Sequence, residues 1–237
     1  MTPIPALELI NLHGGYGRIE VLKGVNLVVP KGTVTALLGP NGAGKTTTLR
    51  AISGGLTPTA GCVHVNGLHL NGAAPEKLSR AGLCLVPEGR GVFPNLTVTE
   101  NLRMTTYAHK ASTRDVLSRA FTQFPRLAER RNQLAGTMSG GEQQMLAMAR
   151  SLVGDPALLL LDEISMGLAP LIVGELYEIV AGLAASGITI LLVEQFARTA
   201  LAVADFAAVM SAGVITTVGQ PGDVTDAVSD AYFGGAA

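Results

Sequence analysis

One glycine-rich segment organises the whole chain: Gly39-Pro40-Asn41-Gly42-Ala43-Gly44-Lys45-Thr46. The β-branched and apolar run Thr33–Leu38 predicts a buried strand before it, and a helix is expected after it as far as about Ser53. The segment fits the pattern GxxxxGK[ST], which is informative only between a strand and a helix. Its glycines let the backbone curl so that several N–H groups hold a phosphate at the positive end of the helix. We therefore predict a phosphate-binding loop in which Lys45 meets the β- and γ-phosphates, Thr46 binds Mg²⁺ and Thr47 is a further nucleotide contact.

Strand-like and helix-like segments alternate along the rest of the chain. Such alternation is typical of an α/β fold with a largely parallel sheet. A helix is expected over Leu171–Ala185, and from Thr97 to Val153 periodic apolar residues and charges predict an inserted group of helices. The predicted strands are Leu7–Leu12, Gly24–Val29, Gly61–Val65, Leu83–Val86, Leu158–Leu161, Ile188–Val193 and a closing hairpin of Ala207–Met210 with Val214–Val218.

Two carboxylates follow the apolar strand Leu158–Leu161, and they are Asp162 and Glu163. Ligands of α/β sheets bind at the carboxyl ends of the parallel strands. Because neighbouring residues of a strand face opposite sides, the two carboxylates should have different roles. Asp162 is expected to hold Mg²⁺ through water, and Glu163 to polarise the attacking water of phosphoryl transfer. Alone, such a pair is equally well explained as a solvated strand end, but downstream of a phosphate loop it becomes informative.

A second helix start carries glycines, at Ser139-Gly140-Gly141-Glu142 before the amphipathic run Met145–Leu152. Ser139 is a natural N-cap, and the two glycines expose N–H groups that attract an anion. One nucleotide does not need two such sites from one chain, so we expect a head-to-tail pair in which this segment covers a nucleotide held by the partner. The alternative is an ordinary helix start after a turn.

The bulk composition excludes several classes of protein. The 237 residues carry a net charge of −1 and are 4% aromatic without tryptophan, which argues against nucleic-acid binding. A cluster of Arg126, Arg130 and Arg131 is expected to be a solvated helix face.

Cys62 and Cys84 lack CxxC spacing and are expected to be buried free thiols. We find neither a signal peptide nor an apolar run near the roughly 18 residues of a membrane span, so a soluble or peripheral protein is expected.

The phosphate loop, the Ser139 segment and the acidic strand, in this order and spacing, resemble the ATPase subunit of an ABC transporter. A narrower resemblance, to the LivF-like ATPases of branched-chain amino acid uptake systems, covers nearly the whole chain. It rests on Val86-Pro87-Glu88-Gly89-Arg90, Val92-Phe93-Pro94, Leu96-Thr97-Val98, Glu100-Asn101-Leu102, Phe124-Pro125-Arg126-Leu127, Gly136–Met145, Gly167-Leu168-Ala169-Pro170, Val193-Glu194-Gln195 and Ala231-Tyr232-Phe233-Gly234-Gly235. The resemblance implies a single ABC ATPase domain over residues 1–237, of the P-loop NTPase fold. Its mainly parallel core sheet would carry an antiparallel β subdomain and a helical subdomain, inserted in the RecA-like core at about 97–153.

The resemblance also implies roles for single residues. Tyr16 falls where an aromatic ring stacks on adenine, with a partly buried turn tyrosine as the alternative. Glu88 falls where most ABC ATPases have a glutamine that meets Mg²⁺ and contacts the transmembrane partner. Gln195 replaces the usual switch histidine, and it can donate a hydrogen bond to the γ-phosphate but cannot be a cation. The implied catalytic residues are Glu163, Lys45 and Gln195, and the implied metal ligands are Thr46, Glu88 and Asp162.

Four further positions depart from the common family pattern. Glu142 replaces a glutamine, Met138 a leucine and Ala169 an aspartate, the last as in the LivF-like group. Ile164 stands where a proline usually follows the acidic residue. Since proline fixes φ, isoleucine is expected to leave Glu163 less rigidly aimed, which affects turnover more than nucleotide binding.

By this resemblance the chain hydrolyses ATP to ADP and phosphate, with Mg²⁺, at an interface with a second ABC ATPase subunit. A heterodimer is expected, with a homodimer as the alternative. Partner permeases would use the cycle for alternating access, served by an extracytoplasmic solute-binding protein, with the chain at the cytoplasmic face of the plasma (inner) membrane. Three other readings stay open: uptake of urea, amides or other amino acids; a soluble ABC ATPase without a transport role; and a nucleotide-gated module with weak hydrolysis.

Overall fold

A six-stranded sheet forms the centre of the molecule, in the order β10-β9-β3-β8-β7-β6. The computed structural model describes residues 3–89, 91–109 and 112–233. The strands from β9 to β6 run parallel to their neighbours, and β10 pairs antiparallel with β9, which confirms the predicted closing hairpin. The strand bounds are β3 Val34–Leu38, β6 Leu83–Val86, β7 Leu158–Asp162, β8 Thr189–Glu194, β9 Phe206–Ser211 and β10 Val214–Gly219.

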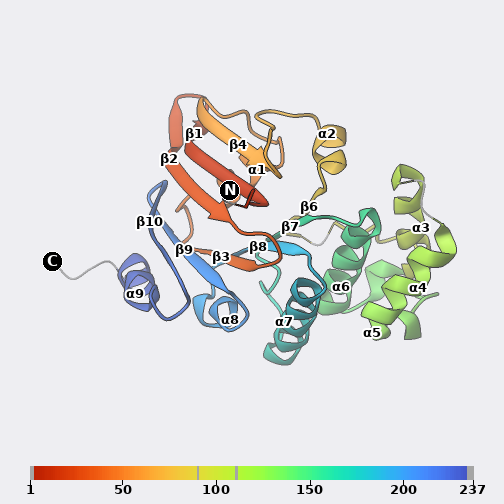
Figure 1. Cartoon of the computed structure of the whole chain (residues 1–237). Coiled ribbons are helices and arrows are strands. Elements are labelled where there is room, and N and C mark those ends of the chain that lie inside the picture. Colours follow the sequence, from red (N-terminus) through yellow and green to blue (C-terminus); the bar gives the residue numbers. More distant parts are fainter. Residues whose placement is uncertain (1–2, 90, 110–111, 234–237) are drawn as a thin grey trace.

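A second, antiparallel sheet of four strands has the order β2-β1-β4-β5 and lies over the central sheet (Figure 1). It consists of β1 Leu7–Tyr16, β2 Ile19–Val29, β4 Ala60–Val65 and β5 Leu68–His69. Strands β1 and β2 are longer than predicted, because register shifts after Leu9, Leu12 and Gly14 keep an irregular segment paired where the apolar alternation has ended. A side chain at Gly15 would overlap the backbone of Ile19, so glycine permits this pairing.

Helices occupy the range where an inserted group was predicted, and α3, α4 and α5 lie together at the far side of α6 from the central sheet (Figure 1). Ser112 caps α4 by accepting a hydrogen bond from the N–H of Asp115. Helix α1 follows the glycine-rich segment and ends before Ser53, as predicted. The helices are α1 Lys45–Ile52, α2 Pro75–Arg80, α3 Val98–His109, α4 Thr113–Gln123, α5 Pro125–Glu129, α6 Gly140–Ser151, α7 Pro170–Ala185, α8 Ala197–Leu201 and α9 Thr225–Phe233, with 3₁₀ turns η1 Ala135–Thr137 and η2 Leu152–Gly154.

The central strands are buried on both faces. Every residue of β7 is buried, and successive side chains alternate between two core clusters. Leu159 and Leu161 pack with α6 and α7, whereas Leu158 and Leu160 pack with α1 and the antiparallel sheet. This double burial explains why the strand is an unbroken apolar run, as parallel strands covered on both faces usually are. It also holds the carboxyl end of β7 rigidly, which matters for the two acidic residues that follow.

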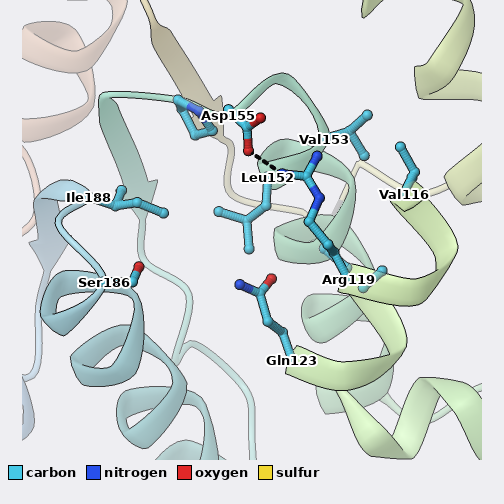
Figure 2. Close-up of a pocket in the computed structure, with 11 residues that line it drawn as sticks. Val116, Arg119, Gln123, Leu152, Val153, Asp155, Ser186 and Ile188 are labelled. Atoms are coloured by element: carbon cyan, nitrogen blue, oxygen red, sulfur yellow. Dashed lines mark hydrogen bonds and ion pairs between the residues drawn. The ribbon is translucent and has the colours of Figure 1, made fainter. Parts of the chain in front are cut away.

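A cavity of about 230 Å³ lies between α4, the turn that precedes β7 and the turn after α7 (Figure 2). Figure 2 shows Arg119 of α4 paired with Asp155 of the turn after η2, over an apolar wall that includes Leu152 and Ile188. Both charged side chains are largely exposed, so the pair contributes little to stability. No residue of the glycine-rich segment lines this cavity.

Two expectations about the whole chain are tested by the fold. Cys62 and Cys84 are free thiols, as predicted, but both are half-buried instead of buried. Burial raises the pKa of the Cys84 thiol, which keeps it protonated and unreactive. Of the three clustered arginines, Arg131 is exposed, as predicted, whereas the partly exposed Arg126 and Arg130 are paired with Glu175 and Glu142. Within the described ranges, no helix combines the length and the apolar character that crossing a bilayer requires.

Candidate nucleotide site

The glycine-rich segment forms a loop between β3 and α1, as predicted. Gly44 is the N-cap of α1 with φ of 110°, and no side chain caps this helix end. A residue with a side chain would be strained at that φ, and a Cβ there would also meet the Met210 side chain. The uncapped N–H groups and the helix dipole make the start of α1 a site for an anion.

Lys45 is buried, and its ammonium group is surrounded by oxygen atoms. The Nζ atom donates to the carbonyl of Gly39 at 2.8 Å and to that of Pro40 at 3.3 Å. It also lies 3.4 Å from Oε1 of Glu163. Phosphate oxygens would compete with these loop carbonyls for the same cation. The lysine is therefore placed at the loop before any phosphate arrives, which lowers the cost of binding.

The loop opens into a cavity of about 470 Å³ that several segments line together. Glu88 comes from the turn after β6 and Glu163 from the end of β7, so residues far apart in the sequence meet at the carboxyl edge of the sheet. Tyr16, Ser139 and Gln195 are not among the lining residues. The lining is Val21, Asn41, Gly42, Gly44, Lys45, Thr46, Thr47, Glu88, Glu163 and Met166.

Asp162 is the buried carboxylate of the acidic pair. Its Oδ1 atom is buried without a hydrogen-bond partner. Burial, followed by the negative charges of Glu163 and Glu88, raises the pKa of Asp162 to about 6, although Lys45 opposes the shift. An unpartnered carboxylate oxygen that feels the negative charge of Glu88 is the kind of oxygen donor that fits Mg²⁺. Glu88 and Thr46 line the nucleotide cavity, whereas Asp162 is not among its lining residues. A bound cation would relieve the electrostatic cost that raises this pKa.

Glu163 lies at the point where the chain leaves β7. Its φ of 46° is the left-handed conformation that residues with a side chain seldom adopt. Its N–H donates to the carbonyl of Val193 at 2.9 Å, and the next residue, Ile164, is buried in the core. The chain therefore leaves β7 through a residue with a strained φ and an anchored N–H, and the predicted effect of Ile164 on Glu163 stays a prediction. Backbone strain of this kind gathers at functional sites.

The Ser139 segment begins α6 with a complete capping box. The Ser139 hydroxyl accepts from the N–H of Glu142 at 3.4 Å, and the Glu142 carboxylate accepts from the N–H of Ser139 at 2.9 Å. The second carboxylate oxygen of Glu142 lies 2.6 Å from Nε of Arg130. Glu142 is thus fully engaged inside its own chain, while Ser139 is exposed. A side chain at Gly141 would overlap Ile172 of α7, so close helix packing requires this glycine.

Tyr16 is the last residue of β1, and Gln195 directly follows β8. Tyr16 is 43% exposed, and its hydroxyl accepts a hydrogen bond of 3.1 Å from Arg50, whose guanidinium lies 5.9 Å from the ring centroid. This exposure leaves a ring face free for a planar ligand. Gln195 is half-buried, and its N–H donates to the carboxylate of Glu194 at 3.2 Å.

Comparison with known protein families gives the same answer as the loop geometry. Residues 22–165 match the family model described as ABC transporter. The chain belongs to the ABC transporter family of ATP-binding proteins. It is 44% identical to the high-affinity branched-chain amino acid transport ATP-binding protein BraG of Pseudomonas aeruginosa, over 93% of this chain and 96% of that protein. It is 35% identical to the probable branched-chain amino acid transport ATP-binding protein LivF of Archaeoglobus fulgidus, over 93% and 94%.

Solved structures of this family have the same fold. The ADP conformation of an ATP-binding cassette of an ABC transporter superposes with a TM-score of 0.87 at 27% identity, covering 97% of this chain and 99% of that one. The structure of another ATP-binding subunit of an ABC transporter gives a TM-score of 0.82 at 30% identity. The predicted fold class is therefore confirmed, and the chain is an ABC ATPase that binds and hydrolyses ATP.

Four residues of this ABC ATPase site were not singled out from the sequence. Val21 and Met166 line the cavity, Arg130 holds the buried Glu142, and the hydroxyl of Tyr232 reaches the loop at Gly39. Arg130 was considered only as a member of a charged face, and its distance of twelve positions from Glu142 carries no periodic signal. Tyr232 was quoted only within the ending typical of the LivF-like group. In both cases the chain fold creates the contact.

Proposed function

We propose that this chain is the ATP-hydrolysing subunit of an ABC importer for branched-chain amino acids. The observation that carries the proposal is the cavity that joins the phosphate loop to Glu163, together with the 44% identity to BraG. The likeness to an arginine transport ATP-binding protein, at 35% identity, keeps another amino acid as the second candidate. An ATPase subunit does not itself contact the solute, so this choice rests on likeness alone.

In the proposed mechanism, the N–H groups of the loop hold the β- and γ-phosphates, and Lys45 leaves the loop carbonyls to meet them. Mg²⁺ held by Thr46, Asp162 and Glu88 would neutralise charge on the phosphates. Glu163 would orient the attacking water and accept its proton, since positioning and charge stabilisation carry most of phosphoryl transfer. Gln195 would donate a hydrogen bond to the γ-phosphate.

We further propose that each site is completed by a second ATPase subunit. Ser139 is exposed on its own chain and lies outside the lining of that chain's cavity, which supports a role toward a nucleotide held by a partner. Tyr16 would stack on the adenine, which its exposed ring favours. BraG and BraF of one organism are 44% and 30% identical to this chain, which supports a heterodimer of two related subunits.

The pair would attach to permease subunits at the cytoplasmic face of the plasma membrane, and a solute-binding protein would deliver the amino acid to the permeases. Glu88 and the helical subdomain at about 97–153 are the proposed contacts of this chain with the permease. The supporting observation is that Glu88 lies at the edge of the nucleotide cavity, where movement on ATP binding would reach a neighbouring protein.

The decisive experiment compares Glu163→Gln and Lys45→Ala in the full-length chain. Glu163→Gln is expected to bind ATP normally and to lower steady-state hydrolysis at least about 100-fold, because general-base catalysis typically contributes that much. Lys45→Ala is expected to lose most ATP binding, measured by titration with a fluorescent nucleotide. Normal hydrolysis by Glu163→Gln would refute the catalytic role of this residue.

The solute is tested separately in a strain that lacks the gene for this chain. Loss of leucine, isoleucine and valine uptake, with arginine uptake retained, is the expected result. The reverse pattern would favour the second candidate. Co-purification of the full-length chain with membranes, and identification of the permease captured with it, tests the partner proposal independently of the solute.

A further inference from the structure

The last helix of the described chain carries a tyrosine whose hydroxyl lies among main-chain atoms of two functional loops. Helix α9 packs beside β9 at the edge of the molecule, far along the sequence from the phosphate loop (Figure 1). The Tyr232 hydroxyl nevertheless lies 3.1 Å from the N–H of Gly39, where the phosphate loop begins. It also lies 2.7 Å from the carbonyl of Gln195, just after β8. One side chain thus joins the two loops directly after the paired residues Leu38 of β3 and Glu194 of β8.

The hydrogen-bonding capacity of a phenol decides how this contact is made. A tyrosine hydroxyl has one proton to donate, and three main-chain groups surround it here: the N–H and the carbonyl of Gly39 and the carbonyl of Gln195. The Gly39 carbonyl already accepts a 2.8 Å bond from Lys45. The Gln195 carbonyl is the nearer acceptor and takes the proton. Tyr232 therefore accepts from Gly39 and donates to Gln195, which forms a continuous bridge between them.

Gln195 is held from its other side by a buried carboxylate. Oε2 of Glu194 accepts the N–H of Gln195 at 3.2 Å, and Oε1 of the same residue accepts the N–H of Ser165 at 3.1 Å. Ser165 lies two positions after Glu163, so Glu194 ties the acidic loop to the same segment. The main chain at Gln195 is consequently clamped by Glu194 through its N–H and by Tyr232 through its carbonyl.

We propose that Tyr232 is a positioning residue for ATP hydrolysis, which sets the place of Gln195 relative to the phosphate loop. The inference rests on the proposed role of Gln195 at the γ-phosphate. Pairing of β3 with β8 ends at Leu38 and Glu194, and the Tyr232 bridge extends this connection by one residue, to Gly39 and Gln195. Burial, the largest effect, raises the pKa of Tyr232 above its ordinary value, so the hydroxyl keeps its proton at physiological pH.

The test is a double-mutant cycle in the full-length chain with Tyr232→Phe and Gln195→Ala. Tyr232→Phe keeps the ring and removes the bridge. It is expected to lower kcat for ATP hydrolysis about 10-fold, since small displacements of a positioned group cost that much or more, and to change the Kd for ATP less than 2-fold. In the Gln195→Ala background the same substitution is expected to cost less than 2-fold, because the group it positions is already gone.

Ser229→Ala is the matched control. It removes an exposed hydroxyl of the same helix, which donates a hydrogen bond to the carbonyl of Thr225 in α9, and it should leave kcat unchanged. An equal loss in both backgrounds, no loss of kcat, or a loss confined to ATP affinity overturns the inference. If Gln195→Ala lowers kcat and Tyr232→Phe does not, only the inference fails. If Gln195→Ala has normal kcat, the proposed role of Gln195 fails with it. Should Tyr232→Phe not fold, amide exchange of Gly39 in the unaltered chain decides: slow exchange supports the bridge and rapid exchange overturns it.

Discussion

At pH 8, replacing Asp162 with asparagine should make the nucleotide-free protein more stable, although Asp162 belongs to the proposed Mg²⁺ site. The carboxyl is buried, one of its oxygens has no hydrogen-bond partner, and the charges of Glu163 and Glu88 lie near it. Its pKa rises from an ordinary value of 3.8 to about 6. A native state that holds this proton more tightly than the unfolded chain loses stability as the pH rises through the range from 3.8 to about 6.

The size of the effect follows from the two pKa values. At pH 8 the cost of ionising this carboxyl in the native state is about 3 kcal/mol, and at pH 4.5 about 1 kcal/mol. Asparagine removes that cost but leaves a buried amide to satisfy, which takes back about 1–2 kcal/mol at both pH values. The advantage of the variant should therefore be about 2 kcal/mol larger at pH 8 than at pH 4.5. For a chain of this length that is a melting-temperature difference of about 4–8 °C.

The assay is thermal unfolding of nucleotide-free wild type and Asp162→Asn at pH 8 and pH 4.5, without Mg²⁺. Asp230→Asn, at an exposed position of α9, controls for the loss of a carboxylate as such. A difference in melting temperature between variant and wild type that stays the same at both pH values would refute the reasoning, because only ionisation of Asp162 depends on pH in this comparison.

The packing at the start of α6 supports two further predictions. Gly141→Ala should lower the free energy of unfolding, measured by urea denaturation, by about 1–3 kcal/mol, because the new methyl group overlaps Ile172. In an Ile172→Ala background the same substitution should cause a smaller loss of stability. An undiminished loss would contradict this explanation. Arg130→Ala should lower the free energy of unfolding by about 1–2 kcal/mol in the same assay, because the buried Glu142 carboxylate loses its cation. The effect stays this small because the Arg130 guanidinium is half-exposed and its charge is screened by solvent. Adding Glu142→Gln should recover part of that loss, and no recovery would show that the charge is not the cause.

Local sequence patterns were sufficient for the elements that form the site. The glycines and the Lys45-Thr46 pair of the loop lie within residues 39–46, and the run before Asp162 is apolar throughout, as a strand buried on both faces requires. The capping box at Ser139 is likewise a local arrangement within four residues. The ends of β1 and β2 were less predictable from the sequence, because the two strands stay paired across register shifts after the apolar alternation has stopped.

Residue order alone determined that this chain has a phosphate loop, an acidic strand end and a capped glycine-rich helix start, because each depends on chemistry within a few successive residues. Tertiary structure alone decided which of these side chains meet: that Lys45 lies 3.4 Å from Glu163, that Arg130 neutralises Glu142, and that Tyr232 reaches Gly39 across 193 positions. Contacts of this kind depend on how strands and helices pack in three dimensions. A one-dimensional pattern has no periodicity that records them, since the intervening chain can vary in length without changing the contact.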